Sequence, residues 1–198
     1  MPARLQLALI VLAACAFAAV VGVLLASRQS AQGLELNDGW AGAIRPPGLR
    51  VPEFALRDQD GMLVTAASLR GKPVVYAFVY STCRDTCPAQ VQTIRGALDD
   101  LGHDLPVVGV SVDPATDTRR LASAFLLEQQ MTGRMEFLLG TRAQLAPVWK
   151  AFGIRPQESR LEHSAHVVLA DRRGLQRIGF PFDHLTEEGL AHDLARLY

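Results

Sequence analysis

The sequence predicts an α/β domain in which helices cover both faces of a mixed β-sheet. Apolar runs typical of buried strands alternate with segments in which apolar residues recur every three or four positions, as in amphipathic helices. A hairpin pattern opens this alternation and a second hairpin pattern closes it. Strands connected through helices pair in parallel and hairpins pair antiparallel, so the sheet should be mixed.

The first expected elements are a hairpin, a central strand and a helix. Residues 51–57 and 63–65 flank Asp58-Gln-Asp-Gly61, a turn sequence typical of hairpins. Residues 73–80 form an apolar run rich in Val and aromatic residues, which predicts a strand buried on both faces. A helix should begin near Cys87, with Pro88 in its first turn. The apolar stripe of this helix consists of Val91, Ile94, Leu98 and Leu101.

The middle of the domain then repeats the strand-helix order twice. Residues 105–112 and 135–139 read as strands. Asp117 is the expected N-cap of the first helix, whereas the second should run from a Thr141 cap to a stop at Gly153. The apolar residues expected to face the core are Leu121, Ala124, Phe125 and Leu127 in the first helix and Leu145, Val148, Trp149 and Phe152 in the second.

A hairpin and a helix close the domain. Residues 166–170 and 175–180 should pair across Asp171-Arg-Arg-Gly174. Thr186 is the expected N-cap of a last helix that runs to Tyr198. At 198 residues the chain has room for one well-buried domain with additional segments. Its 20 Lys and Arg balance its 20 Asp and Glu, which gives no support for nucleic-acid binding.

An apolar segment precedes the domain. From Leu7 to Ala26 there is no polar or charged side chain, and these 20 residues are enough to cross a bilayer. We expect residues 1–28 to be a membrane anchor or signal, residues 29–45 a linker and residues 46–198 the folded domain. A cleaved signal peptide and a lipoprotein modified at Cys15 are alternatives. The poor cleavage site and the eleven apolar residues after Cys15 favour an uncleaved, single-pass anchor of an exported domain.

Cys83 and Cys87 lie where the central strand ends and the next helix begins. They are the only cysteines outside the apolar segment. Free N–H groups at a helix start favour a thiolate over a thiol, and Arg84 between the cysteines should do the same. With this pair at the end of the first long strand, the element order is thioredoxin-like. The pair can exchange disulfides or bind a soft metal ion. A structural disulfide is a further reading, although so short a loop would stabilise the chain little.

Histidine could complete a copper site, because imidazole and two thiolates suit a three-coordinate copper ion. His163 and His166 lie just before and within the penultimate strand, and strand alternation directs them to opposite sides of the sheet. A thioredoxin-like fold brings the loop of His163 against the cysteines, whereas His166 should be a partly buried strand residue with a hydrogen-bonding partner. The remaining histidines, expected on the surface, are His103, His184 and His192.

Three segments occur in an order typical of one family. They are Cys83-x-x-x-Cys87-Pro88, Val110-Ser-Val-Asp-Pro114 followed by Asp117-Thr118, and His163-Ser164. With them, residues 46–198 resemble the Sco/SenC family, membrane-anchored copper proteins that help to build the copper centre of cytochrome c oxidase. Further segments that fit are Phe137-Leu-Leu-Gly140, Trp149-Lys-Ala-Phe-Gly153, Leu169 and Asp171.

The resemblance implies that Cys83, Cys87 and His163 bind copper, as Cu(I), Cu(II) or both. Asp113 and Asp117 would support the site, or serve only as a turn residue and a helix cap. Many family members have proline where this chain has Arg84, a departure that bears on copper affinity, redox poise and partner docking. Implied partners are the copper-bearing subunit of cytochrome c oxidase and other copper chaperones or thiol reductants. The domain would face the periplasm, or an equivalent space, from the inner membrane.

The expected function is therefore that of a copper chaperone, which is not an enzyme in the turnover sense. The alternative is a membrane-tethered thiol-disulfide oxidoreductase with Cys83 and Cys87 as its catalytic redox pair. Such oxidoreductases place a cis-proline before the strand that faces their cysteines, where this chain has His163-Ser164. A peroxiredoxin-type peroxidase is a third reading, but Tyr76 and Tyr80 occupy the positions of the Pro and Thr or Ser in that pattern.

Overall fold

The computed structural model describes residues 12, 15–17, 34, 36–156 and 166–198. Residues 36–198 form one compact unit, separate from residues 1–35. No helix among the described residues is both long and apolar enough to cross a membrane. Most of the expected anchor over residues 1–28 lies outside the described residues, as does His163, so both remain predictions.

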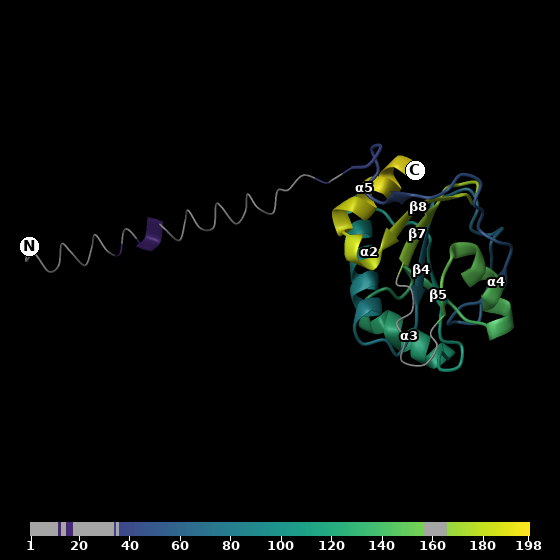
Figure 1. The fold of residues 1–198 in the computed structure, drawn as a ribbon. Helices are drawn as coiled ribbons and strands as arrows, with labels where there is room; N and C mark the ends of the chain where they lie inside the picture. The colour runs from purple at the N-terminus through teal and green to yellow at the C-terminus, as the bar shows by residue number, and fades with distance from the viewer. Residues whose placement is uncertain (1–11, 13–14, 18–33, 35, 157–165) are drawn as a thin grey trace, which may run out of the picture. The chain divides into compact units, whose positions relative to one another are not determined.

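A six-stranded mixed sheet forms the centre of the unit, in the order β1-β8-β7-β4-β5-β6 (Figure 1). β4 pairs in parallel with β5, and β5 with β6, whereas β7 pairs antiparallel with both β4 and β8. The mixed sheet predicted from the sequence is therefore confirmed. The strands are β1 (Ala43–Ile44), β4 (Val74–Val79), β5 (Val107–Ser111), β6 (Glu136–Leu138), β7 (His166–Ala170) and β8 (Gln176–Pro181).

Helices cover both faces of this sheet. In Figure 1, α2 and α5 lie on one side of the strands and α4 lies on the other. Buried residues of α2, α3 and α5 share one apolar cluster, whereas those of α4 belong to a second cluster. The helices are α2 (Thr86–Leu101), α3 (Arg119–Glu128), α4 (Arg142–Phe152) and α5 (Glu187–Leu197), with a short 3-10 helix, η1, at Phe182–His184.

The central strand β4 is buried along its whole length, as its apolar run predicts. Val75, Ala77 and Val79 contribute to the cluster under α2 and α5. Tyr76 and Phe78, which alternate with them, contribute to the cluster under α4. The strand is therefore a rigid support for whatever follows Val79.

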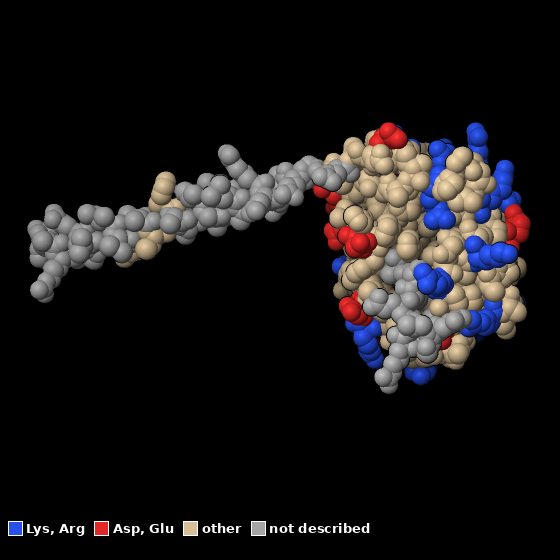
Figure 2. All heavy atoms as spheres, viewed as in Figure 1, with Lys and Arg blue, Asp and Glu red and all other residues tan. Residues whose placement is uncertain are grey.

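Beside the main sheet, β2 (Ala55–Arg57) and β3 (Leu63–Thr65) form the predicted N-terminal hairpin. The buried Asp58 closes its turn, because one carboxylate oxygen accepts hydrogen bonds from the N–H groups of Asp60 and Met62. On the face shown in Figure 2, acidic and basic side chains both occur among large uncharged areas, in keeping with the balanced charge of the chain.

The predicted N-cap of α3 is wrong, and its predicted buried face is right for Phe125 but wrong for Ala124 and Leu127. Thr118, not Asp117, is the N-cap, since Thr118 has an extended backbone and its hydroxyl accepts from the N–H of Leu121. Leu127, expected in the core, is 70% exposed. The residues of α3 that are buried are Ala122, Phe125 and Leu126. Asp117 is not available as a cap because its carboxylate is bound elsewhere, as described below.

One strand was not expected at all. β1 lies within residues 29–45, which the sequence assigns to a linker, and it pairs with β8 through Ala43 and Ile44. The fully buried carboxylate of Asp193 on α5 accepts hydrogen bonds at 2.9 Å from the N–H groups of Ala41 and Gly42. A strand of two residues is too short to show a hydrophobic period, which explains why the sequence pattern does not reveal it.

Candidate metal centre

The two cysteines lie at the junction between β4 and α2, as the sequence predicts. β4 ends at Val79 and α2 begins at Thr86. The N–H of Cys83 donates to the carbonyl oxygen of Tyr80 at 3.2 Å, which closes a turn directly after the strand. Cys87 is the second residue of α2 and therefore lies in its first turn.

The two sulfur atoms have different surroundings. Cys83 is 6% exposed, whereas Cys87 is completely buried. Sγ of Cys83 accepts a hydrogen bond at 3.3 Å from the backbone N–H of Cys87 and lies 3.7 Å from Oγ1 of Thr86. Neither cysteine forms a disulfide. Cys83 is therefore the more accessible sulfur, and Cys87 lies behind it.

The proton of the pair resides on Cys87. A hydrogen bond from the Cys87 thiol lowers the pKa of Cys83 to about 4; burial opposes this shift, and the N–H groups of Asp85 and Cys87 together with the Thr86 hydroxyl add to it. The same thiol-thiolate hydrogen bond, with burial, raises the pKa of Cys87. Burial and a hydrogen bond to Cys83 also raise the pKa of Tyr80.

Arg84, which was expected to favour the thiolate, is exposed. The groups that stabilise the Cys83 thiolate are instead the Cys87 thiol, nearby backbone N–H groups and the Thr86 hydroxyl. The helix start therefore helps to lower the pKa of Cys83, as expected. The charge of Arg84 is not among the causes of this shift.

Asp117 anchors the cysteine loop, the segment between β4 and α2 that carries Cys83. Its carboxylate accepts hydrogen bonds from the N–H of Ser81 at 2.8 Å, from the Ser81 hydroxyl and from the Ser111 hydroxyl. These bonds join the residue two before Cys83 to the end of β5. Burial raises the pKa of Asp117, and the hydrogen bonds from Ser111 and Ser81 act in the opposite direction. Asp117 therefore supports the cysteine loop and does not cap α3.

Asp113 is a turn residue. Its backbone carbonyl accepts from the N–H groups of Thr116 and Asp117, so it opens the turn that leads to α3.

Three neighbours of the site were not predicted from the sequence. They are Ser81, Ser111 and Thr86. Only Ser111 carried a signal, because it is a polar residue inside an otherwise apolar strand.

The start of β7 lies at the same end of the sheet as the cysteines. Val167 pairs with Ala77, near the end of β4 that leads to Cys83. The half-buried His166, as predicted, begins the strand, and its carbonyl oxygen accepts a hydrogen bond at 2.9 Å from Nε2 of the buried Gln90 on α2. The segment that precedes His166 along the chain, including His163, lies outside the described residues.

The other three histidines contact residues other than the cysteines. His103 and His184 are exposed, as expected. His192 is only half-buried rather than fully solvated, and its Nδ1 lies 2.9 Å from the carboxylate of Asp193. Within residues 36–156 and 166–198, no group of three or more His, Cys, Asp or Glu is arranged to hold a metal ion.

The described part of the site therefore offers two adjacent sulfur atoms, and the lowered pKa of Cys83 favours its thiolate form. A soft metal ion could bind them if a third donor were present, since thiolates favour Cu(I) and Zn. The same two groups also fit disulfide exchange, with Cys83 as the nucleophile and Cys87 as the second thiol.

Comparison with known proteins finds relatives of this chain. The chain is 35% identical over 102 residues to Protein SenC of Rhodobacter capsulatus, a match that covers 50% of this chain and 45% of SenC. It is 27% identical over 119 residues to SCO1 homolog 1 of Arabidopsis thaliana, of which it covers 35%. The chain thus spans less than half the length of these two relatives.

Solved structures show the same fold. ScoI of Bradyrhizobium japonicum, solved with copper bound, superposes with a TM-score of 0.65 at 31% identity, covering 75% of this chain and 99% of ScoI. Arabidopsis ScoI, also solved with copper bound, has a TM-score of 0.68 at 22% identity over 76% of this chain and all of the other, which shows the fold alone. These structures confirm the thioredoxin-like fold. The SCO1/SenC family model matches residues 43–198, and the chain therefore belongs to the SCO1/SenC family.

Proposed function

We propose that this chain is a copper-binding chaperone that delivers copper to the copper centre of cytochrome c oxidase, or prepares its thiols, during assembly. The observation that carries the proposal is the pair Cys83 and Cys87, which lie next to each other without a disulfide, and the pKa of Cys83 is lowered to about 4. Membership of the SCO1/SenC family and the copper-bound relative at 31% identity support it.

Copper is the cargo in this proposal, and the donor set suits it. Cys83 offers a thiolate without further deprotonation, whereas Cys87 must release its proton when the metal binds. Because the Cys87 thiol hydrogen-bonds to the Cys83 thiolate, a soft cation can take the place of that proton between the two sulfurs. The low exposure of both sulfurs limits access of water and oxidants to the bound ion.

We propose His163 as the third ligand. It lies three positions before His166, whose carbonyl oxygen is hydrogen-bonded to Gln90. Gln90 lies about one helical turn after Cys87. Three extended residues span up to about 10 Å. An imidazole at position 163 is therefore within chain reach of the first turn of α2, where Cys87 lies.

The location and partners follow from the same proposal. The apolar segment from Leu7 to Ala26 would anchor the chain in the inner membrane by a single pass, with the domain in the periplasm or an equivalent space. The copper-bearing subunit of cytochrome c oxidase would receive copper or electrons from the cysteine site. Other copper chaperones or thiol reductants would load or reduce it.

A second function, thiol-disulfide exchange, is favoured by the low pKa of Cys83. The Cys83 thiolate would attack a disulfide of the partner and release one of its sulfurs as a thiol, forming a mixed disulfide. Cys87 would lose its proton and attack Cys83, releasing the second partner thiol and leaving this chain oxidised by two electrons. A thiol reductant would then restore the reduced pair.

Copper titration of the full chain, reduced and held in detergent, tests the first function. We expect one copper ion per chain, with thiolate-to-copper absorption, and loss of both in the variant with Cys83→Ser and Cys87→Ser. Cys15→Ser is the matched control and should bind normally. Full copper binding by the double variant would refute the proposal. Turnover of a disulfide peptide that needs both cysteines, without copper binding, would favour the second function instead.

A further inference from the structure

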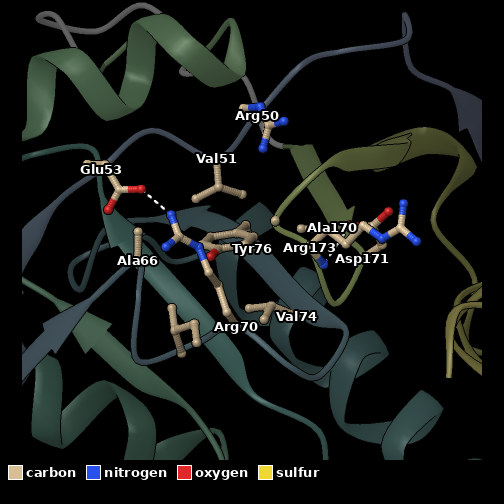
Figure 3. Close-up of a pocket in the computed structure, with 12 residues that line it drawn as sticks. Arg50, Val51, Glu53, Ala66, Arg70, Val74, Tyr76, Ala170, Asp171 and Arg173 are labelled. Atoms are coloured by element: carbon tan, nitrogen blue, oxygen red, sulfur yellow. Dashed lines mark hydrogen bonds and ion pairs between the residues drawn. The ribbon is translucent and has the colours of Figure 1, made fainter.

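A small cavity lies at the end of β4 that is remote from the cysteines (Figure 3). Val74, the first residue of β4, pairs with Ala170, the last residue of β7, and both line the cavity. Its volume is about 110 Å³, several times the share of one water molecule in the liquid, about 30 Å³. It can hold a small organic molecule.

The wall of this cavity includes the phenol of a tyrosine whose ring is buried. Tyr76 is 1% exposed and lines the cavity. None of the hydrogen bonds among the described residues involves its hydroxyl, which is not one of their fully buried polar atoms without a partner and can therefore be reached from the cavity. Burial raises the pKa of Tyr76, and the charge of Arg70 opposes this shift, which places the guanidinium within electrostatic reach of the phenol.

The rim of the cavity carries an excess of positive charge. Arg50, Arg70 and Arg173 line it together with two carboxylates. Figure 3 shows Arg70 beside Tyr76 and paired with Glu53, and Asp171 is paired with Arg177. Each carboxylate therefore has its own arginine. Across the described part of the chain, neither Arg50 nor Arg173 forms an ion pair, so two positive charges are left uncompensated.

The remaining wall is apolar. Val51, Ala66, Leu69, Val74 and Ala170 contribute aliphatic surface. Guanidinium groups and a phenol hydroxyl bind carboxylate oxygens, whereas aliphatic walls favour hydrocarbon and would leave a fully hydrated ion such as phosphate poorly matched. We propose that this cavity binds a small aliphatic monocarboxylate, with its carboxylate toward the arginines and the Tyr76 hydroxyl and its chain against the aliphatic wall.

The chain offers a direct reporter for this site, because its only three tyrosines are Tyr76, Tyr80 and Tyr198. We would label tyrosine with ¹³C at Cζ in the full chain, without copper, and titrate sodium butyrate at constant ionic strength. We expect a saturable shift of the Tyr76 signal with a dissociation constant of roughly 1 mM, the range open to so small a ligand. Tyr80, beside the cysteines, and Tyr198, at the C-terminus, should not move.

Variants separate binding from non-specific effects. The double variant Arg50→Gln and Arg173→Gln should weaken butyrate binding at least about fivefold, because it removes the uncompensated charges. Arg120→Gln, an exposed arginine of α3, should leave it unchanged. Tyr76→Phe, measured by calorimetry, should also weaken it. Equal shifts with uncharged butyramide, an undiminished affinity in the arginine variant, or tighter binding of inorganic phosphate would each overturn the proposal. None of these outcomes depends on copper binding.

Discussion

The backbone N–H of Cys87 donates a hydrogen bond to Sγ of Cys83 at 3.3 Å. The hydrogen bond from the Cys87 thiol and this backbone bond together make the two cysteines unequal, although their spacing in the sequence treats them alike. Negative charge is stabilised on Cys83 by the first turn of α2, whereas the buried Cys87 retains the proton. The asymmetry leads to predictions about reactivity and stability that do not require copper.

Cys83 should react as a thiolate in mildly acidic solution. With its pKa lowered to about 4, Cys83 is almost fully ionised at pH 6, whereas an ordinary cysteine, with a pKa of about 8.5, is under about 1% ionised. We expect iodoacetamide to modify Cys83 at pH 6 nearly as fast as at pH 8, as followed by mass spectrometry. Cys87→Ala should restore a steep pH dependence. A similar dependence in the folded and urea-unfolded chains would contradict this account.

The same pair should give stability an unusual pH dependence. Between about pH 4 and 8.5 the unfolded chain holds one proton more than the folded chain at Cys83, because the folded pKa is lowered, so stability rises with pH. Above that range the folded chain retains a proton on Cys87, whose pKa is raised, so stability falls again. We expect this curve in urea unfolding of the reduced wild type relative to the variant with Cys83→Ser and Cys87→Ser. A pH-independent difference would argue against the opposite pKa shifts of the two cysteines.

Asp117→Ala should lower the free energy of unfolding by about 2 kcal/mol, because it leaves the Ser81 N–H and the Ser111 hydroxyl without an acceptor. Asp113→Ala is the matched control, since no hydrogen bond of the Asp113 side chain occurs among the described residues, and it should cost less. Urea unfolding measures both. If the two variants were equally stable, Asp117 would not anchor the cysteine loop.

The raised pKa of Asp117 adds a pH test. Below its ordinary pKa of 3.8 the carboxyl is protonated in both the folded and unfolded chains. As pH rises through the interval up to the raised folded pKa, the folded chain holds more protons, and stability falls. Asp117→Asn should remove this part of the slope. A slope that is unchanged in Asp117→Asn would show that another group causes it.

Asp193→Ala should detach the N-terminal segment without altering the cysteines. The variant removes the acceptor of the Ala41 and Gly42 N–H groups and should cost about 2 kcal/mol. Hydrogen exchange should accelerate in β1 and at its partners Ile178 and Gly179, while alkylation of Cys83 stays the same. Glu188→Ala, in the exposed first turn of the same helix, should have little effect. Unchanged exchange in β1 would disprove the anchoring role of Asp193.

Elements with a full hydrophobic period could be predicted from the sequence. β4 and α4 illustrate this, because each presents a long apolar pattern and α4 also has the Thr141-Gln144 capping box. β1 could not be predicted, since its two residues are held by Asp193, about 150 positions later in the chain. Long-range polar contacts of this kind leave no local pattern.

In the candidate site, too, features with a local sequence pattern could be predicted and those set by tertiary contacts could not. Cys83 and Cys87 could be predicted because residue type and position at a strand-helix junction were both informative. Asp117 was misread as a cap because Asp117 and Thr118 are both good cap residues and only their tertiary surroundings distinguish them. The inequality of the two sulfurs was also hidden, because it depends on which one receives the hydrogen bond.

The proposed function depends on copper binding by Cys83, Cys87 and His163 together. X-ray absorption at the copper edge, on the full chain loaded with one copper ion, identifies the donor atoms. We expect two sulfur ligands and one imidazole nitrogen in the wild type and in His166→Ala, and two sulfurs without imidazole in His163→Ala, with much weaker copper binding. An imidazole signal and affinity that survive His163→Ala, or are lost equally in both variants, would contradict it.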